Sequence, residues 1–374
     1  MSSGLTRRSI LVAGFALATQ GLLGFRPGDA RASSGPPSHE PGLETLARAV
    51  AWLRTQRTED GRYPSRRYGL LRGGASLTPF TLLALDRAGA LTNEEARGSL
   101  EALAARCTER GALGLREVVA DYPCYASGMM LSTLGRRADV APSGLAARTR
   151  GWLLEQQLTA DRGWHDHPGQ GGWGMGSETI RTPPDAGHVD LSMTRRVIEG
   201  LVASGVEPDH PALREARDFV LRCQTDDGSF FYSPVELALN KGHPDAVGRP
   251  RGYGSATTDG WHALAALDRA TSEPAERALA WLRAHHRLDA SPGVEDGPMH
   301  LFAEAMRGYY RAGSASVFNL AGGPTGWRSA LIETITAEQR PDGSFANPSP
   351  LQKEDDPLIA TAFAVTALAA AEAS

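Results

Sequence analysis

The chain has 374 residues, of which 41% are hydrophobic and 22% are charged. This balance excludes an intrinsically disordered chain and a membrane-embedded bundle, and it supplies enough apolar residues for a sizeable core. The formal net charge is -4, whereas binding to nucleic acid requires a basic face that neutralises phosphates. The sequence therefore disfavours a nucleic-acid partner.

The first 32 residues have the pattern of an export signal. Arg7-Arg8 precede an apolar run that ends at Phe25, and a small-x-small cleavage site follows at Ala30-Arg31-Ala32. These features are typical of a twin-arginine type signal peptide. The apolar run is too short and too interrupted for a membrane anchor, which needs about 20 unbroken apolar residues. We therefore expect a signal peptide over 1–32, a mature protein in the periplasm or outside the cell, and no membrane-spanning segment.

Residues 33–42 are rich in Ser, Gly and Pro and are expected to form a linker, so that the folded domain spans 43–374. Within this domain four segments share one pattern, in which a Gln ends a helical stretch, an Asp/Gly turn follows and an aromatic residue closes the unit. Such self-similarity indicates a repeat architecture. The four units are Gln56 with Asp60-Gly61 and Tyr63, Gln156 with Asp161, Gly163 and Trp164, Gln224 with Asp227-Gly228 and Phe230, and Gln339 with Asp342-Gly343 and Phe345.

Two kinds of helix are expected to alternate along the domain. The segment before each Gln is amphipathic, with Arg and Glu on its polar face, whereas the segment after each turn is apolar nearly all round. The first kind packs on one side only, and the second kind is buried on every side. Gly313 is expected to cap the fifth inner helix. The expected outer and inner helices are 43–57 with 77–88, 93–107 with 124–134, 144–158 with 191–204, 211–223 with 256–270, 275–286 with 299–312, and 328–339 with 358–371.

This alternation predicts an all-α protein, an (α/α)6 toroid of six inner and six outer helices. An open solenoid is the alternative arrangement, but its inner layer would be half exposed and would need polar residues on one side. The three cysteines, at positions 107, 124 and 223, match no metal-binding spacing and are expected to behave as buried small hydrophobic residues.

The repeat Gln-x-x-x-Asp-Gly-x-aromatic, followed by an inner helix such as Thr361-Ala362-x-Ala364-x-x-Ala367-Leu368, resembles the prenyltransferase/squalene-cyclase (squalene oxidase) repeat superfamily. That superfamily includes class II terpenoid cyclases and the β subunits of protein prenyltransferases. The resemblance covers about residues 43–371. It implies the α/α toroid fold strongly and an activity only weakly, because the repeated residues connect adjacent helices.

The catalytic motifs of that superfamily are incomplete in this chain. Asp259-Gly260 resembles the start of the zinc-binding inner helix of protein prenyltransferases, but Trp261 stands where that family has its Cys ligand, while His300 fits the position of its His ligand. A catalytic zinc site needs three protein ligands, so we expect no zinc or other cofactor unless His262 substitutes. The Asp-x-Asp-Asp run of class II cyclases does not occur, and cyclase activity is therefore not supported by a motif.

A toroid of this topology gathers the amino-terminal ends of its inner helices at one rim. The longest connections, 165–189, 231–254, 287–298 and 346–357, lie at the same rim, where sites tend to be built. The cavity floor is expected to be apolar and aromatic, which suits an isoprenoid-like small hydrophobic ligand. Basic residues of the long loops, Lys241 and Arg251 among them, either hold a diphosphate or carboxylate or are solvated. The candidate ligand-binding residues are Tyr125, Trp173, Met193, Trp261, His262 and Arg251.

The candidate catalytic residues are Asp259, His300 and Asp190. Asp259 and His300, on neighbouring inner helices, are expected to form an acid/base pair that faces the cavity, although helix capping also explains an aspartate at such positions. Three functions stay open: an enzyme or binding protein for an isoprenoid-like ligand, a non-catalytic exported scaffold for an unidentified protein partner, and a glycan-active toroid that uses Asp190 and Asp259 as its carboxylate pair.

Overall fold

The computed structural model describes residues 40–295 and 297–373, which belong to one folded unit. The expected signal peptide over 1–32 and residues 33–39 of the expected linker lie outside the described residues. The described part contains thirteen α-helices, three short 3₁₀ helices and no β-strand, so the prediction of an all-α protein is confirmed. The first helix begins at Glu40, inside the expected linker.

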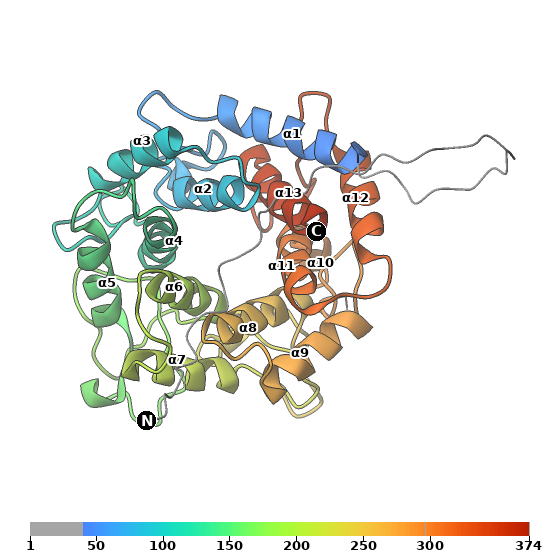
Figure 1. Ribbon diagram of the computed structural model, residues 1–374. Helices are drawn as coiled ribbons and strands as arrows, with labels where there is room; N and C mark the ends of the chain where they lie inside the picture. Colours follow the sequence, from blue (N-terminus) through green and yellow to red (C-terminus); the bar gives the residue numbers. More distant parts are fainter. Residues whose placement is uncertain (1–39, 296, 374) are drawn as a thin grey trace, which may run out of the picture. The chain divides into compact units, whose positions relative to one another are not determined.

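The helices form two concentric layers (Figure 1). A short helix, α10 (Leu301–Ala305), precedes the fifth inner helix, and the 3₁₀ helices are η1 (Gly69–Leu71), η2 (Ala160–Arg162) and η3 (Leu237–Leu239). The outer layer comprises α1 (Glu40–Thr55), α3 (Asn93–Ala104), α5 (Leu145–Gln156), α7 (Pro211–Arg222), α9 (Glu273–Ala284) and α12 (Trp327–Glu338). The inner layer comprises α2 (Leu77–Arg87), α4 (Pro123–Arg136), α6 (Leu191–Ala203), α8 (Gly254–Ala266), α11 (Arg307–Ala321) and α13 (Pro357–Glu372).

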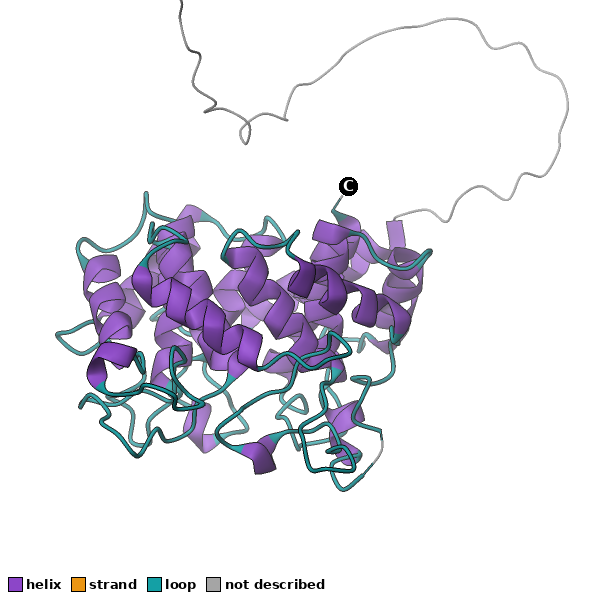
Figure 2. Ribbon diagram, turned by 90° about the horizontal axis from the view of Figure 1, so that it is seen from below, coloured by secondary structure: helices purple, strands orange, loops and turns teal. Residues whose placement is uncertain are grey.

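The inner layer is a closed ring. Helices α2, α4, α6, α8, α11 and α13 contact one another in this order, and α13 contacts α2 in turn, while α1 packs against α12 and α13. The predicted toroid is therefore confirmed, and the open solenoid is excluded. The long outer-to-inner connections gather on one side of the ring (Figure 2), here called the loop rim. None of the helices that the structure describes is both long and apolar enough to cross a membrane.

Local sequence explains why adjacent inner helices approach closely. Gly128 of α4 and Gly200 of α6 face each other across the helix pair: a Cβ added at Gly128 would lie 2.7 Å from the Arg196 carbonyl oxygen, and one added at Gly200 would lie 2.4 Å from the Gly128 carbonyl oxygen. Such distances leave room for hydrogen only. The small residues of the inner layer thus set the spacing between α4 and α6.

In the third, fourth and last units, a Gln side chain joins the unit to the next outer helix. The Gln224 amide Nε2 donates to the Gly228 carbonyl oxygen (3.0 Å) within its own turn and to the Pro274 carbonyl oxygen (2.8 Å) in α9. In the last unit Gln339 Nε2 donates to the carbonyl oxygens of Gly343 (3.1 Å) and Thr45 (2.9 Å). Because Thr45 belongs to α1, this last pair of hydrogen bonds connects the end of the chain to its start.

A second repeated contact joins each turn to its own inner helix. The backbone N–H of the closing aromatic residue donates to a threonine hydroxyl one turn into that helix, as Phe345 does to Thr361 (3.0 Å). The third unit has the same contacts despite an insertion of ten residues between its Gln and its closing aromatic residue. These two residues are Gln157 and Trp173, and not Gln156 and Trp164 as the sequence pattern predicted. Gln157 Nε2 donates to the Gly171 carbonyl oxygen (2.9 Å), and the Trp173 N–H donates to Thr194 Oγ1 (3.1 Å).

The fifth inner helix differs from its expected position of 299–312. The helix is interrupted at Met306, which separates α10 from α11. Helix α11 then continues to a C-cap at Gly322, which has a φ of 84°. Gly313 lies inside α11 and caps nothing; a Cβ there would lie 2.4 Å from Thr258 Oγ1 of α8. The glycine therefore serves close packing between α8 and α11, and reading it as a cap displaced the expected helix toward the amino terminus.

Replacing Gln339 by Ala is expected to lower the free energy of unfolding by about 1–3 kcal/mol, because two partly buried carbonyl groups lose their donor. Gln56 is the matched control, since it holds the equivalent place in the first unit but its Nε2 donates to the exposed Thr55 hydroxyl (2.8 Å). Urea unfolding followed by circular dichroism measures both variants. Equal losses in the Gln339→Ala and Gln56→Ala proteins would contradict the ring-closing role of Gln339.

Candidate functional site

The ring encloses a central cavity of about 470 Å³, a size typical of small-molecule sites. All six inner helices contribute side chains to its wall, and the loops of the rim add others. Most of the lining is apolar or aromatic. The largest apolar members are Leu77, Phe80, Met129, Met175, Met193, Met306, Ile359 and Phe363, and the tyrosines are Tyr122, Tyr125, Tyr232, Tyr253 and Tyr309.

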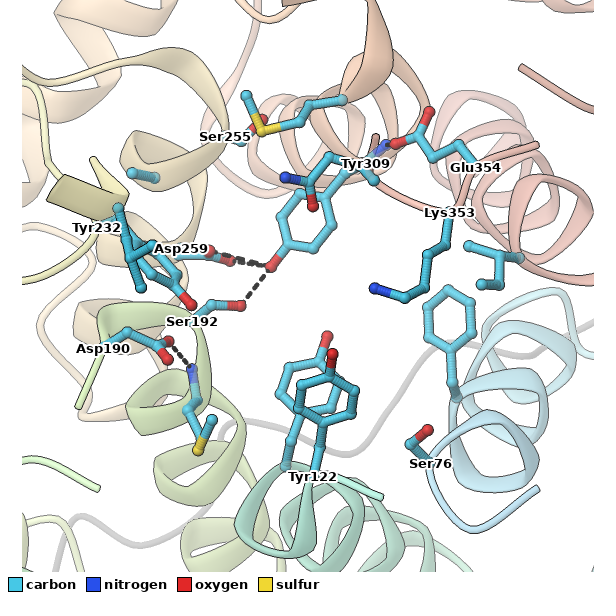
Figure 3. Close-up of a pocket in the computed structure, with 18 of the residues that line it drawn as sticks. Ser76, Tyr122, Asp190, Ser192, Tyr232, Ser255, Asp259, Tyr309, Lys353 and Glu354 are labelled. Carbon is cyan, nitrogen blue, oxygen red and sulfur yellow. Dashed lines mark hydrogen bonds between the residues drawn. The ribbon is translucent and has the colours of Figure 1, made fainter. Parts of the chain in front are cut away.

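A buried carboxyl group lies in this apolar wall. Asp259 stands in the middle of α8 and is 3% exposed. Its Oδ1 accepts from Arg195 Nη1 at 2.7 Å, and the Tyr309 hydroxyl lies 2.8 Å from Oδ1 and 3.0 Å from Oδ2. The same hydroxyl is 2.8 Å from Ser192 Oγ. Figure 3 shows Ser192, Tyr309 and Asp259 joined in this way at the cavity.

Arg195, the partner of Asp259, is itself held by the Glu199 carboxylate. Arg195 Nε donates to Glu199 Oε1 (2.8 Å), and Arg196 Nη1 donates to Glu199 Oε2 (3.0 Å). The Arg196 guanidinium also lies over the Tyr125 ring, 5.7 Å from its centroid. Although burial opposes ionisation of Glu199, Arg195 and Arg196 hold the pKa of that carboxyl well below its usual range. Buried charges are tolerated in such a network because each one has a partner.

Asp259 has the environment of an acid/base group. Burial raises the pKa of Asp259, and the nearby Arg195 and the Tyr309 hydrogen bond oppose that rise. The two donors also fix the orientation of the carboxyl group. A carboxyl so oriented, in a cavity lined mainly by apolar groups, can hold a proton and transfer it to a bound ligand.

A second polar cluster lies at the loop rim. Asp190 caps α6, because its Oδ1 accepts from the Met193 N–H at 2.7 Å. Its Oδ2 lies 2.9 Å from His188 Nε2, and the same nitrogen lies 2.9 Å from the Tyr232 hydroxyl. The hydrogen bond to Asp190 raises the pKa of His188, against the opposing effect of burial. Asp190, His188 and Tyr232 all line the cavity.

A third carboxyl group, Glu354, orients the helix that carries Tyr309. Glu354 accepts from the backbone N–H groups of Gly308 and Tyr309, each at 2.9 Å, and from Asn347 Nδ2 at 3.2 Å. Gly308 and Tyr309 belong to the first turn of α11, where a carboxylate complements the helix dipole. Burial nevertheless raises the pKa of Glu354 to about 7.

Comparisons with known proteins give structural neighbours. Neither a protein-family model nor a curated protein matches the chain. The type II terpene cyclase MstE from Scytonema, solved in complex with geranylgeranyl dihydroxybenzoate as substrate, matches with a TM-score of 0.59 and 16% identity over 89% of this chain and 98% of that chain. A protein from Actinoplanes matches with a TM-score of 0.57 and 16% identity over 89% and 100% of the two chains. A glycosidase matches with a TM-score of 0.53 and 14% identity over 90% and 98%.

The chain has the α/α toroid fold of these proteins. Each match spans nearly the whole partner chain, so the toroid of this protein is similar to complete neighbours and not to one repeat of them. At this identity the similarity concerns the fold, and the neighbours include both a terpene cyclase and a glycosidase. The chemistry of this toroid must therefore be argued from its own cavity.

The expected pair of Asp259 and His300 is not formed. Asp259 faces the cavity and binds Arg195 and Tyr309, whereas His300 is exposed at the start of α10 and does not line the cavity. The His300 Nδ1 lies 3.1 Å from the Gly297 carbonyl oxygen of its own loop. The shift of the fifth inner helix explains the error, since it places Tyr309, and not His300, opposite Asp259.

Four of the expected ligand-binding residues lie elsewhere. Trp261 and His262 follow Asp259 by two and three residues, and at about 100° per residue they point to other sides of α8; both are buried outside the cavity lining, with His262 Nε2 3.2 Å from the Gly313 carbonyl oxygen. Trp173 is the closing aromatic of the third unit, and its Nε1 donates to the Leu153 carbonyl oxygen (2.7 Å). Arg251 is exposed on its loop.

The structure places Asp259, Asp190, Tyr125 and Met193 in the cavity wall. Sequence reasoning missed Tyr309 and Glu354, which come from segments whose register or loop path the sequence does not specify. It also missed the Arg195 network, although a signal existed: Arg195, Arg196 and Glu199 stand on an inner helix that is otherwise expected to be apolar. Among the described residues, no group of three or more His, Cys, Asp or Glu side chains is arranged to hold a metal ion.

His188 is expected to titrate with a pKa above 6.5 in the folded protein, because its hydrogen bond to Asp190 stabilises the imidazolium. The Asp190→Asn variant keeps a capping side chain but removes the charge, so the pKa should fall below that of the wild type. The Asp190 contribution to stability through His188 is then present below pH 6.5 and lost as the pH rises through the folded pKa. Histidine NMR titration, assigned with a His188→Gln variant, measures the shift; an unchanged pKa in Asp190→Asn would contradict this cause.

Proposed function

We propose that the protein binds an isoprenoid-like ligand in the central cavity and that Asp259 acts on that ligand as an acid/base group. The observation that carries the proposal is the buried Asp259 carboxyl, oriented by Arg195 and Tyr309 within a wall of methionine and aromatic side chains. A flexible hydrocarbon gains free energy from burial in such a wall without needing polar partners. As part of the same proposal, the mature protein acts in the periplasm or outside the cell, after export by the signal at 1–32.

The non-catalytic scaffold would require a filled centre and an Asp259 used as a helix cap. The cavity instead holds about 470 Å³, and Asp259 stands six positions into the α8 helix of Gly254–Ala266. Under the scaffold alternative, side chains such as Trp261 and Met193 would fill the centre, but Trp261 is buried outside the cavity lining and Met193 forms part of the wall. The cavity therefore favours a ligand-binding protein over a scaffold.

A glycan-active toroid would need two carboxyl groups free to face a sugar ring. Asp190 and Asp259 both line the cavity, but Asp190 is not free to act as the second carboxyl group, because its Oδ1 caps α6 at the Met193 N–H and its Oδ2 lies 2.9 Å from His188 Nε2. An oligosaccharide also needs polar partners along its length, and most of this lining is apolar. We therefore favour the isoprenoid-like ligand.

The test combines three variants of the mature protein with a series of isoprenoids from farnesol to squalene. Asp259→Asn should bind the ligand as the wild type does, while conversion falls by roughly 10²–10⁴-fold, since the variant lacks the acid/base group. Ala256→Phe, which places a phenyl ring in the cavity, should abolish binding. His300→Ala, outside the cavity, is the control and should change neither property.

Native mass spectrometry measures the bound ligand, and gas chromatography of the extracted ligand measures conversion. Unimpaired conversion by Asp259→Asn would refute the acid/base role of Asp259. Wild-type binding by Ala256→Phe would show that the ligand lies elsewhere. Binding of oligosaccharides in place of isoprenoids would favour the glycan-active alternative.

A further inference from the structure

Lysine has an unusual distribution in this protein. Of the 39 lysine and arginine residues, two are lysines, Lys241 and Lys353. Both line the central cavity, and no arginine does. Lys241 comes from the loop before α8 and Lys353 from the loop before α13, so two separate segments of the loop rim each bring an ammonium group to the same space. Figure 3 shows the Lys353 side chain extending into the cavity.

No carboxyl group that the structure describes in the cavity wall forms an ion pair with either lysine, although the Asp190 carboxylate opposes the fall that burial causes in the pKa of Lys241. Asp259 is paired with Arg195, Asp190 with His188, and Glu354 with the first turn of α11. Among the described residues, no ion pair joins Lys241 or Lys353 to a carboxylate. The cavity thus contains two positive charges for which the surrounding protein supplies no counter-charge at contact distance.

Each lysine is held in its place. Lys241 Nζ donates to the Leu239 carbonyl oxygen (2.5 Å) and lies 5.5 Å from the Tyr232 ring centroid and 5.1 Å from that of Phe302. Burial lowers the pKa of Lys241. Lys353 has a φ of 61°, a left-handed conformation that costs free energy for a residue with a side chain and marks positions where function requires it. Its Nζ lies 5.9 Å from the Tyr68 ring centroid.

Two ammonium groups that are not ion-paired with a carboxylate, at the wall of a mainly apolar cavity, attract an anion, because attraction between opposite charges strengthens as the surroundings become less polar. An ammonium is also a compact point charge, which a flexible stem can bring to a single oxyanion. We propose that the cavity ligand carries an anionic end group, a carboxylate or a phosphate, which binds Lys241 and Lys353. This inference rests on the proposed function, and it directs the hydrocarbon part of the ligand inward, toward Phe363 and the Asp259 carboxyl.

Three probes with the same hydrocarbon chain test this inference: geranylgeraniol, geranylgeranoic acid and geranylgeranyl phosphate. The acid, the phosphate or both should bind the wild type at least roughly tenfold more tightly than the alcohol at low salt. Lys241→Met and Lys353→Met should each reduce this preference toward unity, while Lys353→Arg should retain most of it. Arg251→Met removes an exposed cation from the same rim and is the matched control, which should leave the preference unchanged.

The outcomes separate the two proposals. Equal affinity for the three probes in the wild type, or a preference unaffected by both lysine-to-methionine variants, would overturn the anionic end group while leaving the isoprenoid site intact. Binding of none of the probes would overturn the proposed function itself. The ranking of acid against phosphate identifies the oxyanion. Thermal melts followed by circular dichroism show whether each variant is folded. If Lys241→Met is unfolded, Lys353→Met alone decides the test.

Discussion

Arg195 and Asp259 form an ion pair in which each side chain is 4% exposed, inside a ring of otherwise apolar helices. Removing both charges from water is costly, and their mutual attraction repays this only when the remaining donors and acceptors are also engaged. Here Glu199 binds the other side of Arg195, and Tyr309 binds both carboxyl oxygens of Asp259. A single buried network thus connects α6, α8 and α11, and Asp259 is its carboxyl group at the cavity wall. The site depends on this arrangement, because an unpaired Arg195 or Asp259 would be expelled toward water.

The ring closure determines what that network can do. A carboxyl group in an open solenoid would face water, and its pKa would stay near the ordinary value. In the closed toroid Asp259 is only 3% exposed, and the repeated Gln contacts, of which Gln339 to Thr45 is the last, hold the ring closed. Two kinds of contact recur around the ring. In one, a Gln side chain donates to two backbone carbonyl oxygens, and in the other, the N–H of the closing aromatic residue donates to a threonine hydroxyl. The repeats therefore supply a rigid wall, while the loops of the rim, which do not repeat, supply its individual polar groups.

The division between repeats and loops also explains how much could be predicted from the sequence. Periodicity placed eleven of the twelve layer helices close to their observed positions, because amphipathic and fully apolar segments differ in composition. It placed Asp259 and Asp190 correctly at the cavity, because the expected inner helices began close to both residues; in the structure Asp190 caps α6, whereas Asp259 lies in the middle of α8. The prediction failed where one residue type is compatible with two roles. Gly313 packs against α8 but was interpreted as a helix cap, and the expected fifth inner helix therefore placed His300 where Tyr309 lies. Trp173 was predicted to bind the ligand because an insertion separates it from Gln157, and its place as the closing aromatic residue of the third unit was not recognised. The paths of the loops that bring His188, Lys353 and Glu354 inward leave no periodic signal.

The two kinds of basic residue have different tasks in this molecule. Arginine makes the forked contacts that join helices, as in Arg311, whose Nη1 and Nη2 donate to the two oxygens of Glu338 at 2.7 and 3.0 Å. A guanidinium suits this task because its donors are fixed in one plane. Buried Arg195 is paired in the same way with carboxylates of the protein itself, Glu199 and Asp259. Within the described part of the chain, Lys241 and Lys353 form no ion pair with a carboxylate, and both line the cavity. Because a folded chain keeps an uncompensated charge beside an apolar space only at a cost, the missing counter-charge is best supplied by whatever occupies that space.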